Sequence, residues 1–214
     1  MAKTQTANPR VGPKTKGAGI AGAVAVIIGT VFAVEGGYVN DPIDPGGETN
    51  HGITAAVAIE HGYTGDMRDL KRECTFEGEI CAESIYAESY IEKPGFLPLV
   101  YIDPAVAEET IDTAVNMGPR RPSRYFQRAL NEVCGTFVSV DGRIGPSTVG
   151  NWLICRLDKG PAACVDMLAS MDRQQEAEYD RLVRVNPSLR RFRRGWQNHR
   201  IGNVDPDLCG DTLQ

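Results

Sequence analysis

An uncharged apolar run at residues 17–34 limits most strongly what this 214-residue chain can fold into. The run, GAGIAGAVAVIIGTVFAV, leads directly into Glu35 and a stretch rich in glycine and acid. As an α-helix, such a run rises roughly 27 Å, just under the ~30 Å hydrocarbon core of a bilayer. Four glycines and five alanines dilute it, so its preference for a membrane should be small.

The charges around this run give it an orientation. Four basic residues and no acid precede Glu35, whereas residues 35–172 carry a net charge of −11. By the positive-inside tendency, residues 1–16 form a cytoplasmic tail and everything after residue 34 is exported. Three fates remain open for the run: a cleaved signal peptide, a permanent anchor, or a signal-anchor that is inserted, retained and later leaves the bilayer. We favour the third, because cleavage after Ala33 would leave Glu35 on a frayed terminus.

Six cysteines lie in the exported part, and their even number in an oxidising compartment predicts up to three disulfides. They are Cys74, Cys81, Cys134, Cys155, Cys164 and Cys209. The near pairs Cys74/Cys81 and Cys155/Cys164 are plausible, which leaves Cys134/Cys209, although sequence alone does not fix connectivity. Zinc is the alternative, but no Cys-x-x-Cys occurs and the three histidines are scattered.

Glu35 combines features of a general acid. Gly36, Gly37 and Pro42 stop a helix, so Glu35 is expected at the C-terminus of an apolar helix, followed by a hairpin-like segment. The helix dipole and desolvation both favour the protonated carboxyl there. Asp44, on a more solvated loop, would stay ionised to direct water or stabilise an oxocarbenium-like state. A plain turn or a calcium loop remains an alternative, but the segment lacks EF-hand spacing.

Two sequence signatures resemble glycoside hydrolase family 108, lysozyme-like N-acetylmuramidases found largely in phage endolysins. One runs from Glu35-Gly36-Gly37-Tyr38 to Gly52-Ile53-Thr54, and the other is IDTAVNMGP at residues 111–119. The resemblance implies that Glu35 is the catalytic acid. Within the signatures, Tyr38, Asp41, His51 and Asn116 are expected to contact substrate.

A wider resemblance is to T-even phage lysozymes, which space a glutamate, an aspartate and a threonine much as Glu35, Asp44 and Thr49 are spaced. This chain has four residues, not five, between the aspartate and the threonine. The resemblance implies that Asp44 is the second carboxylate, with Asp41 as its rival, and that Thr49 positions water. Such chemistry needs no metal and no cofactor.

The region after Pro119 resembles a predicted peptidoglycan-binding module that commonly follows the family 108 part. A helical bundle that merely completes the core is the alternative, and we expect one packed unit that also binds glycan. Near its end, eight arginines against three acids give residues 173–200 a net charge of +5. This cluster is a solvated face, or a contact for anionic wall polymer or phospholipid. Export argues against nucleic acid.

Periodicity and capping signals predict the remaining helices. Asp103-Pro104 should begin a helix that ends at Gly118-Pro119. The other helices are expected near residues 18–35, 82–92, 122–133, 146–158, 161–184 and 187–198, with a small hairpin at 38–54. The fold class is therefore mainly α (α+β), lysozyme-like, with a small β-hairpin near the active site and a helical C-terminal part.

These expectations combine into one hypothesis. Residues 1–16 are the tail, 17–34 the releasable anchor, 35–119 the catalytic domain and 120–214 the peptidoglycan-binding-like region. The chain is expected to be a monomeric phage endolysin that cleaves the β-1,4 bond between N-acetylmuramic acid and N-acetylglucosamine. Held inactive in the host inner membrane through residues 17–34, it would be released into the periplasm. A non-enzymatic anchored peptidoglycan-binding protein and a lytic transglycosylase are the alternatives.

Overall fold

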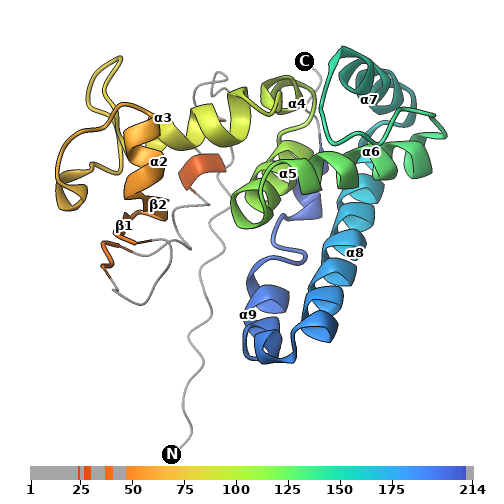
Figure 1. The fold of residues 1–214 in the computed structure, drawn as a ribbon. Coiled ribbons are helices and arrows are strands. Elements are labelled where there is room, and N and C mark those ends of the chain that lie inside the picture. Colours follow the sequence, from red (N-terminus) through yellow and green to blue (C-terminus); the bar gives the residue numbers. More distant parts are fainter. Residues whose placement is uncertain (1–23, 25–26, 30–36, 41–46, 211–214) are drawn as a thin grey trace, which may run out of the picture.

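The computed structural model describes residues 24, 27–29, 37–40 and 47–210, and most of the chain within them is helical (Figure 1). A two-stranded antiparallel sheet is formed by β1 (Thr49–Asn50) and β2 (Ile53–Thr54). The α-helices are α2 (Ala55–Glu60), α3 (Ala82–Ala87), α4 (Leu97–Ile102), α5 (Pro104–Met117), α6 (Arg120–Cys134), α7 (Pro146–Lys159), α8 (Pro161–Val185) and α9 (Arg190–His199). Short helical turns are η1 (Met67–Asp69), η2 (Glu88–Glu92), η3 (Pro187–Leu189) and η4 (Pro206–Cys209). The mainly α fold class with a small β-hairpin is confirmed.

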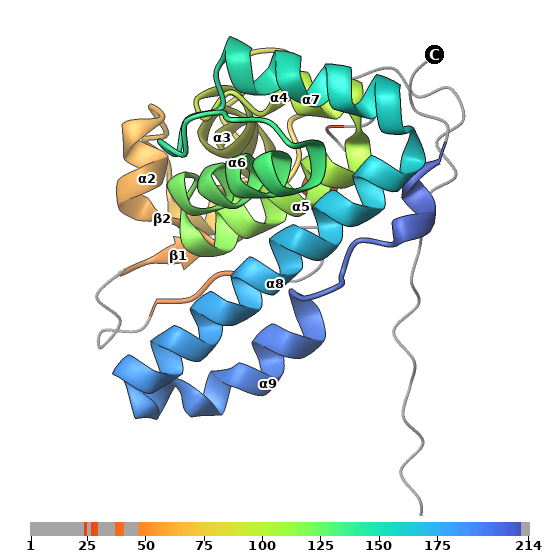
Figure 2. The ribbon, with the colours of Figure 1, turned by 90° about the vertical axis from the view of Figure 1, so that its right-hand side faces the viewer.

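The elements form two groups on either side of α5. The hairpin, α2 and α3 lie on one side, and α6, α7 and α8 lie on the other (Figure 1). Turning the molecule shows α8 crossing the whole structure, with α9 folded back along its C-terminal half (Figure 2). This arrangement places the hairpin and the end of α8 toward the same side of the molecule.

Helix starts and stops follow the predicted signals closely from Asp103 onward. The Asp103 carboxylate accepts hydrogen bonds from the backbone N–H groups of Ala105 and Val106, and Pro104 occupies the first turn of α5. Gly118 ends that helix with φ of 78°, a conformation that favours glycine. The helix expected near residues 82–92 is present as α3 followed by the π-helical η2. The sequence reasoning did not anticipate the two six-residue helices α2 and α4.

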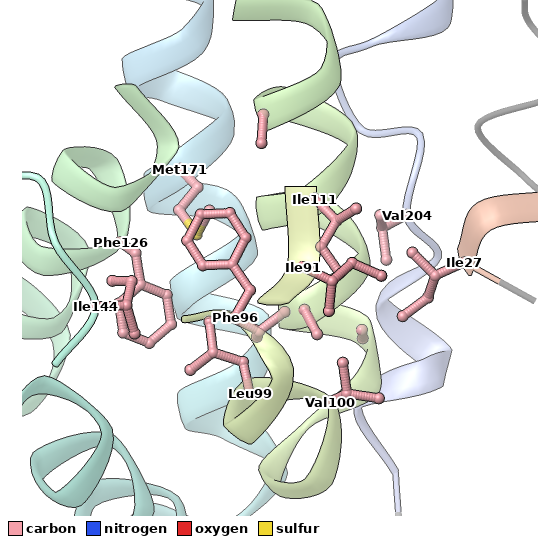
Figure 3. Packing of buried hydrophobic residues seen from close by; sticks show 14 of the residues in the cluster. Ile27, Ile91, Phe96, Leu99, Val100, Ile111, Phe126, Ile144, Met171 and Val204 are labelled. Carbon is pink, nitrogen blue, oxygen red and sulfur yellow. The ribbon is translucent and has the colours of Figure 1, made fainter. Parts of the chain in front are cut away.

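A single hydrophobic core runs through both groups of helices. Phe96 and Leu99 from the α4 region, Ile111 from α5, and Phe126 and Met171 from α6 and α8 meet at its centre (Figure 3). Trp152 is fully buried, with its ring edge-on to Phe126 at 6.0 Å between centroids. Its complete burial makes Trp152 a core residue.

Part of the apolar run belongs to this core. Ile27 and Ile28 are 2% and 3% exposed, and Ile27 packs near Ile91, Ile111 and Val204 (Figure 3). Residues 24 and 27–29 are helical, whereas the remainder of the run lies outside the described residues. No helix in the part of the chain that the structure describes is long and apolar enough to cross a membrane.

The six cysteines form three disulfides, but two of the expected pairings are wrong. Cys74–Cys81 is as expected, whereas the others are Cys134–Cys155 and Cys164–Cys209. Cys155 lies on α7, which packs against α6 and hence against Cys134. Cys164 lies in the first turns of α8, which packs against η4 and Cys209. The packing of separate helices, and not nearness in sequence, therefore decides these two disulfide pairings.

The burial of Ile27 generates a stability prediction. Ile27→Ala should lower the free energy of unfolding by about 2–5 kcal/mol, because the truncation removes apolar contacts and leaves a cavity. Denaturant titration of the purified protein measures this loss. Ile59→Ala is the matched control, since Ile59 is 66% exposed on α2 and its truncation should change stability by no more than ~0.5 kcal/mol. Equal stability of the two variants would contradict the assignment of Ile27 to the core.

Candidate active site

The described residues of the first signature form a small sheet. Val39 and Thr49 exchange two backbone hydrogen bonds of 2.8 Å, so residues 40–48 leave and return at one point. β1 and β2 then pair Thr49 with Thr54 and Asn50 with Ile53 across a two-residue turn. His51 and Gly52 in that turn both have positive φ, at 52° and 76°, as a type I′ hairpin turn requires. The hairpin predicted for this segment is therefore present.

Three side-chain contacts fix the hairpin to the rest of the protein. The Asn50 side chain is buried and donates a 2.7 Å hydrogen bond to the Met67 carbonyl. The Tyr86 hydroxyl donates to the His51 carbonyl at 3.1 Å. Thr54 caps α2 by accepting from the Val57 N–H. Because the turn is held from both sides, the base of the 40–48 loop has a fixed position.

Tyr38, one of the predicted substrate contacts, lies at the base of this loop. Its hydroxyl donates a 2.7 Å hydrogen bond to Glu48 Oε1, and the Arg68 guanidinium lies 5.3 Å from its ring centroid. The hydrogen bond with Tyr38, more than the charges of Asp66 and Glu48, raises the pKa of the Arg68 side chain. Sequence reasoning missed Arg68 and considered Glu48 only as a ligand in the calcium-loop alternative. Nothing in the spacing of Arg68 indicated that η1 would bring it to Tyr38.

The predicted catalytic residues are only partly described. Thr49 lies in β1, and its hydroxyl donates to the Gly47 carbonyl at 3.2 Å. Thr49 thus lies in the small sheet, His51 lies in its turn, and Tyr38 precedes Val39, which bridges to Thr49. Glu35, Asp41 and Asp44 lie outside the described residues. What the structure does establish is the pair of residues, Val39 and Thr49, at which the aspartate-bearing loop begins and ends.

Asn116, from the second signature, lies at the C-terminal end of α5. Its side-chain amide donates to the Tyr179 hydroxyl on α8, which also accepts from Gln175 at 3.3 Å. The Tyr179 ring stacks on Trp196 of α9 at 4.7 Å between centroids. Trp196 thus packs at least one ring face against protein. No local signal indicated that Asn116 would contact Tyr179, 63 residues away.

The described residues provide no ready zinc site. Cys74, Cys81 and Glu83 are the group of possible ligand atoms that lie close together there. Cys74 and Cys81 are joined in a disulfide and offer no thiolate, whereas zinc binds cysteine as a thiolate. The zinc alternative to disulfides is therefore not favoured for this pair.

Comparison with known families decides the class of protein. Residues 28–118 match the family model described as Glycosyl hydrolase 108, and residues 121–201 match the model described as Predicted Peptidoglycan domain. Residues 28–118 are a glycoside hydrolase family 108 domain. The chain is thus an enzyme, a glycoside hydrolase that acts on peptidoglycan.

A solved structure shares the fold of the chain. The structure titled "Structure of Brucella abortus SagA" is 26% identical, with a TM-score of 0.61, and the match covers 91% of this chain and 98% of that one. No curated protein matches the chain. The resemblance to family 108 followed by a peptidoglycan-binding module is therefore confirmed.

A buried acidic cluster joins the family 108 domain to the peptidoglycan domain. Glu109 and Asp112 of α5 are 2% and 5% exposed, and Asp172 of α8 lies near them. Arg200 pairs with Asp112, Thr113 donates to Glu109 at 3.1 Å, and the Gly202 N–H donates to Asp172 at 3.0 Å. Burial, with the charges of Asp172 and Asp112, raises the pKa of Glu109 well above its ordinary value. Burial also raises the pKa of Asp172.

The Glu109 carboxyl makes stability depend on pH. Because its pKa is raised in the folded state, its contribution is fully present below its ordinary pKa of 4.5 and is lost as pH rises through the folded value. The Glu109→Gln side chain cannot ionise. The free energy of unfolding of this variant should therefore rise relative to that of the parent as pH increases. Denaturant titrations at several pH values measure this difference. Glu60→Gln, at the exposed end of α2, is the control, and a pH-independent difference for Glu109→Gln would contradict the explanation.

Proposed function

We propose that this enzyme is a muramidase that hydrolyses the β-1,4 bond between N-acetylmuramic acid and N-acetylglucosamine. The observation that carries the proposal is the closed loop between Val39 and Thr49, anchored within a family 108 domain. Asp41 and Asp44 lie on this loop, and Glu35 precedes its first residue by five positions. The pairing of Val39 with Thr49 holds the two ends of this acidic segment together, and glycoside hydrolysis of this kind uses two carboxyl groups.

Each residue has a separate role in this reaction. Glu35 protonates the glycosidic oxygen as the bond to the sugar breaks. Asp44 stays ionised and either directs water to the anomeric carbon or stabilises positive charge that develops there. The Thr49 hydroxyl, at the end of the loop, helps to place the water. Tyr38, Asp41, His51 and Asn116 contact the glycan.

Digestion of purified peptidoglycan tests the reaction. Glu35→Gln should reduce release of soluble fragments by a factor on the order of 10²–10⁴, as expected for loss of a general acid. Glu60→Gln, which removes a carboxylate from an exposed position on α2, should leave the rate unchanged. If Glu35→Gln solubilised peptidoglycan at the parent rate, the assignment of the acid would be wrong.

Mass analysis of the same fragments separates hydrolysis from transglycosylation. A muramidase releases fragments with reducing N-acetylmuramic acid ends, whereas a lytic transglycosylase releases 1,6-anhydro ends. We expect reducing ends. Fragments that carry only 1,6-anhydro ends would reject the muramidase in favour of the transglycosylase.

The biological setting we propose is lysis of a Gram-negative host by a bacteriophage. The enzyme, a monomer, is held inactive in the host inner membrane by residues 17–34, faces the periplasm and is later released into it. The burial of Ile27 and Ile28 supports this regulation, because these side chains cannot fill the core while they are inside a bilayer. Burying each contributes about 1.5–3 kcal/mol, so an inserted segment leaves the fold incomplete.

Cell fractionation tests release from the membrane. Dissipating the membrane potential with an uncoupler should move the parent protein from the membrane fraction to the soluble periplasmic fraction as lysis begins. A variant with Gly19→Leu and Gly22→Leu is more apolar and should stay in the membrane and delay lysis. Lysis by a protein that remains wholly membrane-bound would overturn the release mechanism.

A further inference from the structure

The end of the peptidoglycan domain carries a concentrated positive charge. Arg184 lies near the C-terminus of α8, and Arg190, Arg191, Arg193 and Arg194 lie on α9. We call these five residues the arginine tip. Since α9 folds back along α8, the tip occupies one end of the helical pair (Figures 1 and 2). It contrasts with residues 35–172, whose net charge is −11.

The arginine tip borders a groove. Asp180, Val183, Arg184, Arg190 and Arg193 line a hollow of about 460 Å³ between α8 and α9. Arg193 is held by Asp180, which accepts from its Nε at 2.9 Å. Among the residues that the structure describes, no carboxylate lies within ion-pair distance of Arg184, Arg190 or Arg194. Arg184 and Arg190 therefore line the hollow together with one neutralised pair, and Arg194 adds a further exposed guanidinium group on α9. All three retain their capacity for an anion.

The guanidinium groups indicate which kind of anion the arginine tip can bind. Each presents planar N–H donors that match a carboxylate or phosphate in a two-point contact. The groove opens to solvent beside these groups, so an anionic group on a flexible chain can reach several of them at once. Such binding is electrostatic and should weaken as salt increases.

The apolar residues near the tip argue against insertion into a lipid bilayer. Trp196 stacks on Tyr179, and Phe192 lies between Trp196 and the Arg191 guanidinium, which is 4.6 Å from its ring centroid. A helix that binds in a membrane interface needs a continuous apolar face to bury there. On α9, Trp196 is half-buried and Phe192, although 44% exposed, is one ring among exposed arginines, so the helix presents no continuous apolar face.

We infer that the arginine tip binds the free carboxylates of the stem peptides in peptidoglycan. This inference rests on peptidoglycan as the substrate and does not depend on which residue is the general acid. The hairpin and the end of α8 lie toward the same side of the molecule (Figure 2). A peptide bound at the arginine tip therefore holds the wall on the side where the proposed active site lies.

Co-sedimentation with purified sacculi tests the arginine tip. Full-length Glu35→Gln protein serves as the parent, so that the sacculi stay intact during the assay. A variant with Arg184→Gln, Arg190→Gln and Arg194→Gln should bind about tenfold or more weakly, because three charge contacts are lost. The matched control removes three exposed arginines elsewhere, by Arg128→Gln, Arg143→Gln and Arg173→Gln, and should bind like the parent. Circular dichroism verifies that all the proteins are folded.

Chemical modification of the wall identifies the ligand. Sacculi whose carboxylates have been converted to amides should bind the parent as weakly as untreated sacculi bind the tip variant. If amidation leaves binding of the parent unchanged, or if both triple variants bind alike, the inference is wrong. Vesicles of phosphatidylglycerol and phosphatidylcholine provide the lipid comparison. A tip-dependent difference on vesicles but not on sacculi would reject the wall in favour of the membrane.

The assay separates this inference from the proposed function. Fragments released from sacculi are measured in the same tubes. Release by the Glu35→Gln parent would count against Glu35 as the acid, whereas the difference between the two triple variants reports on the arginine tip alone. Failure of either idea is therefore visible without failure of the other.

Discussion

The buried ion pair between Asp103 and Arg156 is the interaction on which the arrangement of the helices depends. Asp103 is fully buried and accepts a 2.7 Å hydrogen bond from Arg156 Nε on α7. The same carboxylate caps α5, and Arg156 Nη2 also donates to the Cys209 carbonyl at 3.0 Å. Burial raises the pKa of Asp103, while Arg156 and the capping N–H groups oppose that rise. Removing one partner of such a pair typically costs about 3–5 kcal/mol, because the other charge is left uncompensated.

This pair also joins the two family units to each other. Asp103 belongs to the family 108 domain, Arg156 to the peptidoglycan domain, and the Cys164–Cys209 disulfide lies beside them, with Cys164 Sγ 3.3 Å from Asp103 Oδ1. Farther along α5, Arg200 pairs with Asp112 and Tyr179 accepts from Asn116. The boundary between the two family matches thus runs through a continuous core. We regard the C-terminal part as completing the catalytic fold as well as binding the wall.

Sequence reasoning was most accurate for structural features that depend on neighbouring residues. The cap at Asp103, the stop at Gly118 and the hairpin around His51 and Gly52 each depend on a few adjacent residues. The disulfide partners of Cys155 and Cys164 could not be predicted, because they depend on which helices pack together. The contacts of Arg68 with Tyr38 and of Tyr179 with Asn116 join residues 30 or more positions apart, and no local signal indicates them.

The apolar run shows a different limit of sequence reasoning. A buried helix and a membrane helix require the same side chains, so Ile27 and Ile28 satisfy both interpretations until packing is known. The structure also describes only part of the candidate active site. Thr49 and Tyr38 have defined contacts, whereas Glu35 and Asp44 lie outside the described residues and keep the roles that the family resemblance implies.

The continuous helix α8 has a consequence for how the enzyme meets a surface. Its 25 residues correspond to a length of roughly 37 Å, with Cys164 fixed by a disulfide near one end and Arg184 near the other. Its buried residues run from Ala163 to Tyr179, so the helix cannot tilt without disturbing the core. A contact at the Arg184 end of α8 therefore acts on the whole rigid protein. Attachment at that point restricts the rotation of the entire molecule.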